Sequence, residues 1–349
     1  MTTTREDLAA VPLYAPQPLA GVDLDLRDNV NLWGTPPAAL AAVRAVELAD
    51  LREYPNGSAS TLGRLVAERV GVGTEQVVLG CGSDDVIDAW LRAVGSSGDI
   101  VAHADPSFSM VPTFARLNRL RPIGVPLTAD GPMDVDALLA TGAPLIYVCS
   151  PNNPTGTVTP RAELLRLFDR APGAVLLDEA YAEFSDAHDL RAEAARRPNV
   201  LVTRTFSKAW GLAGLRVGYG VGSAALVAAV TKARGPYKVN AMAERAAAAA
   251  LRADVTWVED AAGEAREVRE RFADGLRGRK GVTVWPSEGN FVFLQVDGRA
   301  ADVAERFRAG GIGVRAFTGL TGIGDAVRIG VAPWPQMARA LRVAQEIWP

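Results

Sequence analysis

The chain has 349 residues, 48% of them hydrophobic, so it can bury a large core and is too long for one ordinary domain. Charged residues make up 22%, and the net charge of −3 gives no electrostatic basis for binding nucleic acid or anionic lipid. Two cysteines and two histidines leave almost no ligands for zinc, so we predict no metal site. No apolar run reaches the roughly 20 residues that span a bilayer, and residues 1–7 lack the apolar core of a signal peptide. We therefore expect a cytoplasmic protein with reduced thiols.

Apolar runs alternate with helical patterns over the first two thirds of the chain. Residues 62–70 and 164–168 place their apolar side chains on one helical stripe. The expected strands are residues 76–79, 100–102, 145–148, 174–177, 200–203 and 217–221. Strands that alternate with helices predict an α/β fold, in which helices flank a mostly parallel sheet and ligands bind at the strands' carboxyl ends.

The pattern changes after about residue 243. An amphipathic stretch at 264–276 and helices at 301–309 and 336–347 surround a few short strands. The strands are expected at 282–285, 290–294, 313–315 and 327–329. This arrangement predicts a second, smaller α+β domain.

The most informative segment is Thr-Phe-Ser-Lys-Ala-Trp-Gly-Leu-Ala-Gly-Leu-Arg, residues 205–216. Lys208 follows the apolar run 200–203, where desolvation favours a neutral, nucleophilic amine that can form a Schiff base with an aldehyde. Thr205, Ser207 and Arg216 beside it are the groups that a phosphate needs. Together they indicate an aldehyde that carries a phosphate, namely pyridoxal phosphate, bound through Lys208.

Two other segments end apolar runs in the same way. The Pro- and Asn-rich turn 150–157 follows the strand at 145–148 and can aim an amide at an oxygen. Asp178 ends the run 174–177, where a buried carboxylate needs a partner such as a protonated pyridine nitrogen. Tyr181, three residues later, can reach the phenolic oxygen of the same ring.

The motifs SPNNPTG, DEAY and TFSKAWGLAGLR resemble the signature of class I/II aminotransferases of fold type I, most closely the histidinol-phosphate aminotransferase branch. The resemblance runs from Tyr14 to Arg328. It implies that Lys208 is the Schiff-base lysine and that Asp178 pairs with the pyridine nitrogen. It also implies contacts with the ring oxygen from Asn153 and Tyr181, and with the phosphate from Ser207 and Arg216.

The resemblance also implies a domain division. The N-terminal arm, residues 1–45, is expected to pack with the small domain at 243–349. Residues 46–242 form the large cofactor-binding domain.

Further cofactor contacts are expected in two turns. Gly82, Ser83 and Asp84 open a probable helix after a strand, where free N–H groups attract a phosphate, although a simple capped turn is the alternative. Phe108 follows another strand and offers an aromatic face to the cofactor ring, with core packing as the alternative. Relatives normally carry tyrosine at this position.

The resemblance implies a homodimer in which Tyr54 crosses to the partner's cofactor phosphate. Tyr14 matches a tyrosine that contacts substrate in relatives. Trp33 lies in the arm, where the family's Asn-Glu-Asn-Pro run is replaced by Asn-Val-Asn-Leu. It is a candidate for substrate contact or a hydrophobic anchor of the arm.

Arg315 and Arg328 lie in strand-like segments and match two arginines that hold the substrate's anionic group in relatives. We therefore expect an aminotransferase that acts on an anionic substrate, either histidinol phosphate or an aromatic or cationic 2-oxo acid. A decarboxylase of the threonine-phosphate decarboxylase type shares these motifs. A regulatory module that binds the cofactor without turnover is less consistent with them, because binding alone does not need Asp178.

Overall fold

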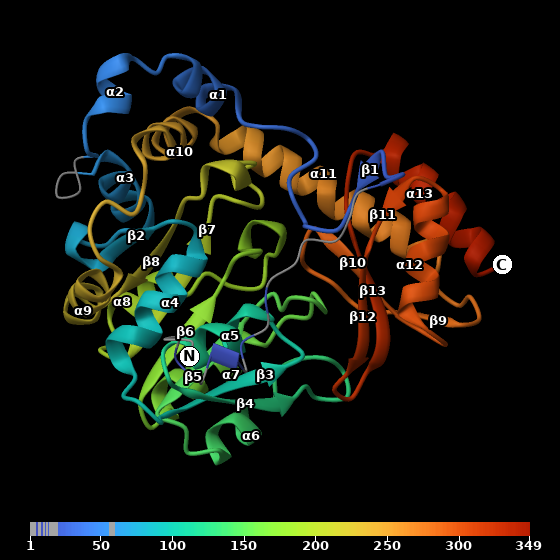
Figure 1. The fold of residues 1–349 in the computed structure, drawn as a ribbon, viewed down its shortest axis with the longest axis horizontal. Helices are drawn as coiled ribbons and strands as arrows, with labels where there is room; N and C mark the ends of the chain where they lie inside the picture. Colours follow the sequence, from blue (N-terminus) through green and yellow to red (C-terminus); the bar gives the residue numbers. More distant parts are fainter. Residues whose placement is uncertain (1–4, 6–7, 10, 12, 14–19, 56–59) are drawn as a thin grey trace.

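The computed structural model describes residues 20–55 and 60–349, together with residues 5, 8, 9, 11 and 13. Tyr14 therefore lies outside the described residues. A seven-stranded sheet and a four-stranded antiparallel sheet lie beside each other, each with its own helices (Figure 1). These two sheets confirm the predicted α/β fold with a smaller second unit.

The large sheet has the strand order β2-β8-β7-β6-β5-β3-β4. Strand β8 runs antiparallel to both of its neighbours, and the other adjacent pairs are parallel. All six predicted strands belong to this sheet. No apolar run marks β4, an edge strand that contains Pro122 and tolerates it because an edge has unpaired positions. The bounds are β2 (Val77–Gly80), β3 (Ile100–Asp105), β4 (Arg121–Pro126), β5 (Leu145–Cys149), β6 (Ala174–Asp178), β7 (Val200–Thr205) and β8 (Gly218–Gly222).

Helices cover both faces of the large sheet because successive strand residues point to opposite sides. Leu145 and Tyr147 pack in the cluster that contains α4 (Ser83–Val94), α5 (Met110–Leu117) and α9 (Ala224–Arg234). Ile146 and Val148 pack in the cluster that contains α6 (Val135–Ala140), α7 (Arg161–Arg170) and α8 (Arg191–Ala195). Short 3₁₀ turns are η2 (Thr74–Gln76), η3 (Ala182–Phe184) and η4 (Ala213–Leu215).

The small sheet has the order β12-β13-β10-β9 and is antiparallel throughout. The segment expected as one strand at 313–315 is divided at Val314 between β11 and β12. The bounds are β9 (Val282–Val284), β10 (Phe291–Val296), β11 (Ile312–Gly313), β12 (Arg315–Leu320) and β13 (Gly324–Gly330), with helices α12 (Ala300–Ala309) and α13 (Trp334–Ile347).

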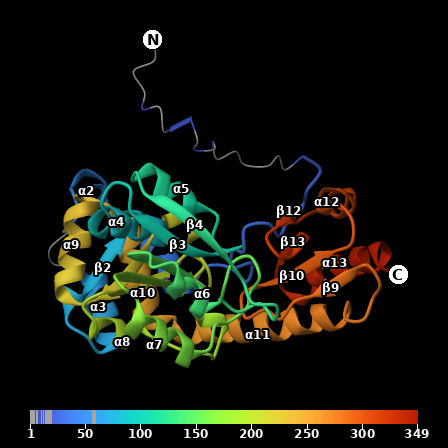
Figure 2. The same ribbon diagram turned by 90° about the horizontal axis from the view of Figure 1, so that it is seen from below.

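Two segments link the sheets. Strand β1 (Leu24–Asp25) pairs in parallel with β11, so this part of the N-terminal segment lies against the small unit. Helix α11 (Val255–Asp274) begins nine residues before the predicted stretch and runs from the helices of the large sheet to the small sheet (Figure 2).

Helix α10 (Ala241–Ala253) packs on α1 (Pro37–Arg44) and α3 (Thr61–Val70), close to α2 (Leu48–Arg52).

Within the part of the chain that the structure describes, no helix is long and apolar enough to cross a membrane. The same residues contain no cluster of histidine, cysteine and carboxylate side chains that is suited to a metal ion.

Asp254, between α10 and α11, caps the start of α1: its Oδ2 accepts the backbone N–H groups of Ala38 (2.8 Å) and Ala39 (3.3 Å). We expect Asp254→Ala to lower the free energy of unfolding by about 1–2 kcal/mol, because buried N–H donors lose their acceptor. Asp254→Asn keeps an acceptor oxygen and should lose less. Urea denaturation measures both, and equal stability of all three proteins would exclude this capping role.

Candidate active site

A cavity of about 140 Å³ lies at the carboxyl ends of β5, β6 and β7, next to the first turn of α4. The segments 150–157, 178–181 and 205–216 therefore meet at one place, although they are far apart in the chain. The lining residues are Ser83, Asp84, Phe108, Cys149, Asn153, Asp178, Ala180, Tyr181, Thr205, Ser207, Lys208 and Arg216.

Lys208 lies on the turn that follows β7. Its Nζ donates a hydrogen bond to the backbone carbonyl of Asp28 at 2.9 Å and lies 5.8 Å from the ring centroid of Tyr181. Burial and the nearby positive charge of Arg328 lower the pKa of Lys208 to about 8. A larger fraction of this amine is therefore neutral and nucleophilic near neutral pH than in an ordinary lysine.

Asp178 is buried at the end of β6. Its Oδ2 accepts the Tyr147 hydroxyl at 2.8 Å, and its Oδ1 accepts the backbone N–H of Ala180 at 3.1 Å and the Thr203 hydroxyl at 3.4 Å. Burial raises the pKa of Asp178 to about 6. No cation pairs with this carboxylate among the described residues, so a protonated ring nitrogen would complement it.

Tyr181 and Asn153 hold polar groups at the same cavity. The Tyr181 hydroxyl accepts a hydrogen bond from Nδ2 of Asn29 at 3.1 Å, and burial raises the pKa of Tyr181 to about 12. The phenol therefore stays protonated and can donate a hydrogen bond. The Asn153 Oδ1 accepts from Nη1 of Arg328 at 2.5 Å, which leaves the Asn153 amide N–H groups as donors.

Arg216 reaches the turn before α4 from the end of its own segment. Its Nη1 donates to Ser207 Oγ at 3.2 Å, and its Nη2 lies 3.3 Å from the Asp84 carboxylate. Gly82, with φ of 80°, allows this approach because a Cβ at this position would lie 2.6 Å from Arg216 Nη2. The positive φ favours glycine at this position, and a side chain there would also displace the Arg216 guanidinium.

The donors around this turn suit a phosphate. The N-cap of α4 is Gly82, which has no side chain to bond the first turn, so among the described residues the backbone N–H groups from Ser83 onward are available to an anion. Thr205 and Ser207 add two hydroxyls, and the Ser207 N–H is bonded to Thr205 Oγ1 at 3.1 Å. With the amine of Lys208 and the buried carboxylate of Asp178, this donor set fits pyridoxal phosphate.

The two predicted substrate arginines are neighbours. Arg315 on β12 and Arg328 on β13 are directly opposite in the antiparallel register, so their side chains share one face of the sheet. Arg328 is 7% exposed and donates to the carbonyl of Arg27 at 2.6 Å. Its Nε has no hydrogen-bond partner, and no carboxylate pairs with it, in the described part of the chain. Burial lowers its pKa, so a bound anion would stabilise the charge.

The lining of this cavity does not include the predicted site residues Gly82, Arg315, Arg328, Tyr54 and Trp33. Tyr54 is 80% exposed, and its ring stacks on Tyr237 with centroids 4.7 Å apart. Trp33 is half-buried against the main hydrophobic cluster, and its Nε1 is buried without a hydrogen-bond partner in the described structure. This packing agrees with the anchoring alternative for Trp33.

Several contacts carry no signal in the sequence. Tyr147 lies within an apolar strand, and alternation alone gives no reason to connect its hydroxyl with Asp178. Asp28 and Asn29 contact Lys208 and Tyr181 across about 150 to 180 positions of the chain. The departure of the arm from the family pattern is the one feature that draws attention to this segment.

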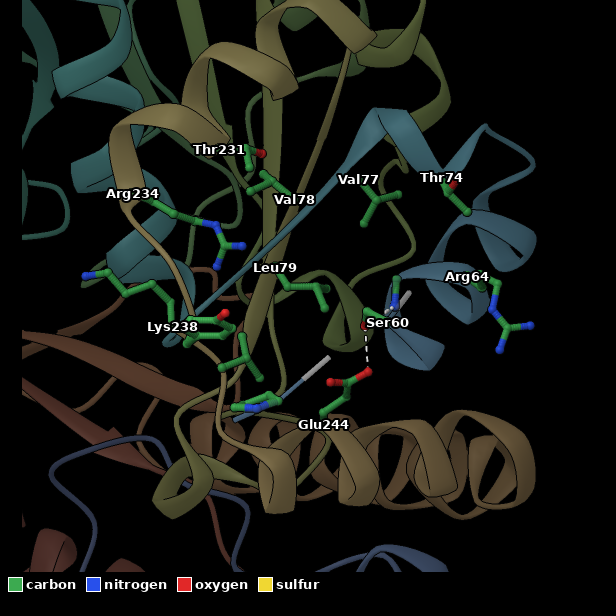
Figure 3. Close-up of a pocket in the computed structure, with 14 residues that line it drawn as sticks. Ser60, Arg64, Thr74, Val77, Val78, Leu79, Thr231, Arg234, Lys238 and Glu244 are labelled. Atoms are coloured by element: carbon green, nitrogen blue, oxygen red, sulfur yellow. Dashed lines mark hydrogen bonds between the residues drawn. The ribbon is translucent and has the colours of Figure 1, made fainter. Parts of the chain in front are cut away.

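A second cavity, of about 290 Å³, lies between α3, β2, α9 and the residues before α10 (Figure 3). Figure 3 shows Ser60 hydrogen bonded to Glu244 at one end, at 2.7 Å, and the side chains of Arg234 and Lys238 at the other. Its lining includes neither Lys208 nor Asp178. The cavity at the ends of β5 to β7 is therefore the candidate active site.

Over residues 22–343 the chain matches the family model for aminotransferase class I and II. An aromatic amino acid aminotransferase from Rhodococcus jostii (strain RHA1) is 38% identical over 320 residues, which cover 90% of this chain and 88% of that protein. An aromatic amino acid aminotransferase from Streptomyces coelicolor is 36% identical over 354 residues, which cover 98% of this chain and 96% of that protein.

Solved structures share the fold. Histidinol-phosphate aminotransferase from Sinorhizobium meliloti, in complex with pyridoxal-5'-phosphate, has a TM-score of 0.90 and 24% identity over 99% of both chains. L-threonine-O-3-phosphate decarboxylase from Porphyromonas gingivalis has a TM-score of 0.80 and 24% identity over 93% of this chain and 98% of its own. The family match and the identity to the curated relatives show that this chain belongs to the class I and II aminotransferases and is a pyridoxal-phosphate-dependent enzyme.

Proposed function

We propose that the enzyme transfers an amino group between an aromatic amino acid and a 2-oxo acid, and that Arg328 holds the substrate's carboxylate with help from Arg315. The observation that carries this proposal is the buried guanidinium of Arg328. Among the described residues, no carboxylate forms an ion pair with it. Its Cζ lies 5.5 Å and 5.7 Å from the ring centroids of Phe291 and Phe317, so an aromatic side chain has apolar partners nearby. The names of the relatives support the same substrate class.

The cofactor-holding roles follow from the contacts. When bound, pyridoxal phosphate supplies an electron-accepting ring that stabilises negative charge on the substrate's α-carbon. Asp178, fixed by Tyr147 and Ala180, would keep the ring nitrogen protonated. Tyr181 and Asn153 would donate to the ring oxygen, and Phe108 would face the ring. The phosphate would lie against Gly82, Ser83, Thr205, Ser207 and Arg216.

Lys208 would hold the cofactor covalently and, once released from it, move the proton at the substrate's α-carbon. A pKa of about 8 suits this role, because the neutral amine can accept a proton and the ammonium can return it near neutral pH. The Asp28 carbonyl fixes the direction of Nζ. The chain therefore supplies one group for both attachment and proton transfer.

Two alternative activities are separated by one assay. The protein, incubated with pyridoxal phosphate, is given aromatic amino acids, histidinol phosphate or O-phosphothreonine, and both amino transfer and CO2 release are followed. We expect the highest kcat/KM for amino transfer from an aromatic amino acid. Faster amino transfer from histidinol phosphate would show that histidinol phosphate, not an aromatic amino acid, is the substrate. CO2 release from O-phosphothreonine would indicate a decarboxylase.

We also propose a homodimer in which Tyr54 reaches the partner's cofactor phosphate. Tyr54 and Tyr237 are 80% and 53% exposed, and Leu48 and Leu51 on α2 are 76% and 63% exposed. Large apolar side chains that gather on one surface of a monomer favour a protein partner.

Lys208→Ala should give a folded protein in which borohydride fixes no cofactor to the chain, because the attaching amine is absent. The measurement is mass spectrometry of peptides after reduction. Lys280→Ala, which removes an exposed lysine, is the control and should keep the modified peptide. A modified peptide and normal turnover in Lys208→Ala would place the attachment elsewhere.

Asp178→Asn should lower kcat by about 10²–10³, because it removes the charge that stabilises the protonated ring nitrogen while nearly preserving shape. Cofactor affinity should change less, since the phosphate contacts remain. Tyr147→Phe removes one hydrogen bond to the same carboxylate and should have a smaller effect on kcat. Near-normal turnover in Asp178→Asn, measured with saturating cofactor, would show that another group stabilises the protonated ring nitrogen.

Arg328→Ala should raise KM for the amino acid by about tenfold to a hundredfold, since hydrogen bonds between charged groups contribute ~1.5–3 kcal/mol. Arg315→Ala, at the more exposed neighbouring position, should act more weakly. We expect a simple dicarboxylate to inhibit the unaltered enzyme more strongly than inorganic phosphate does. Unchanged kinetics in both variants would remove these arginines from the substrate site, and stronger inhibition by phosphate would favour a phosphate ester.

A further inference from the structure

The first turn of α4 contains a second carboxylate, Asp85, which pairs with Lys238, whereas Asp84 pairs with Arg216. The side chain of Asp85 is 11% exposed, and its Oδ2 accepts the backbone N–H of Cys81 at 3.1 Å. Gly80 packs against this carboxylate, since a Cβ there would lie 3.2 Å from Asp85 Oδ2. Asp85 therefore fixes the shape of the turn between β2 and α4, whose N–H groups are available to an anion.

The negative charge of Asp85 would also repel a phosphate bound at the start of α4. Asp84, in the same turn, is balanced by Arg216 at 3.3 Å, but Asp85 has no contact with that guanidinium. Lys238 balances Asp85 instead, with its Nζ 3.2 Å from Asp85 Oδ1. Two cations and two carboxylates thus surround the turn in separate pairs.

Arg234, the last residue of α9, adds a second positive charge near Asp85. Burial lowers the pKa of Arg234, and the Asp85 charge opposes that effect. Figure 3 shows Arg234 and Lys238 at the same end of the second cavity, the one between α3, β2 and α9. Lys238 contacts Asp85 directly, with Nζ 3.2 Å from Oδ1, and Nε of Arg234 has no hydrogen-bond partner in the described structure.

We propose that Lys238 is a positioning residue for the cofactor phosphate. It neutralises Asp85, so the turn keeps the hydrogen bond that shapes it without repelling the phosphate. The inference rests on the proposed phosphate position at the start of α4. Because Tyr237 stacks on Tyr54, the same ion pair also ties this turn to the surface proposed for the dimer.

The test measures cofactor affinity of the full-length protein after removal of its cofactor. Pyridoxal phosphate and pyridoxal, which has no phosphate, are titrated separately by absorbance, and inorganic phosphate is added as a competitor. Lys238→Met should weaken the binding of pyridoxal phosphate and of inorganic phosphate by about twofold to fivefold and leave the binding of pyridoxal unchanged. Lys238→Arg should retain affinity, and Lys280→Met, which removes an equal charge from an exposed site, should have no effect.

The double variant D85N/K238M shows whether Lys238 acts through Asp85. We expect it to recover most of the lost affinity, because the uncompensated carboxylate is gone and the amide oxygen that replaces it can still accept the Cys81 N–H. An equal loss for pyridoxal and pyridoxal phosphate in Lys238→Met, no loss at all, or no recovery in the double variant would overturn the proposal. If inorganic phosphate does not compete in the unaltered protein, the phosphate position fails, which is distinguishable from failure of the Lys238 role.

Discussion

The buried carboxylate of Asp178 places the strongest constraint on this structure. Burial raises its pKa, and three donors hold it: a backbone N–H, the Tyr147 hydroxyl and the Thr203 hydroxyl. The last two come from β5 and β7, the strands on either side of β6, and the register pairs Asp178 with Cys149 and Thr203. A shift of one residue in either pairing would turn these side chains to opposite faces. The parallel register of the sheet therefore determines whether the site exists.

The N-terminal segment is a second support of the site. The carbonyls of Arg27 and Asp28 accept hydrogen bonds from Arg328 and Lys208, and Asn29 donates to Tyr181. Asn29 has a left-handed φ of 52°, which asparagine tolerates better than most residues. Three consecutive residues thus contact groups from three different elements, and the pairing of β1 with β11 ties them to the small unit. Movement of the small unit would be transmitted directly to Lys208 and Tyr181.

The candidate residues Lys208, Asp178 and Asn153, which the structure brings to one cavity, share one property: each follows an apolar run at the carboxyl end of a strand. These residues stand out because a polar group at such an end needs a partner. Tyr147 and Asn29 could not be predicted, because their partners are set by tertiary contacts. The start of α11 was misplaced because the alanine-rich residues before it give little contrast between faces. Tyr54 depends on a second chain, so its role stays a prediction.

The charges of the cavity connect substrate binding to the chemistry. Arg328 contributes to the low pKa of Lys208, since a positive charge nearby disfavours a second one. A substrate carboxylate bound to Arg328 would offset that repulsion and raise the pKa of the lysine amine. A larger fraction of the amine would then be protonated with substrate bound than with the substrate site empty. With Arg328 as the proposed carboxylate partner, substrate binding and the protonation of Lys208 would be coupled through the charge of this one arginine.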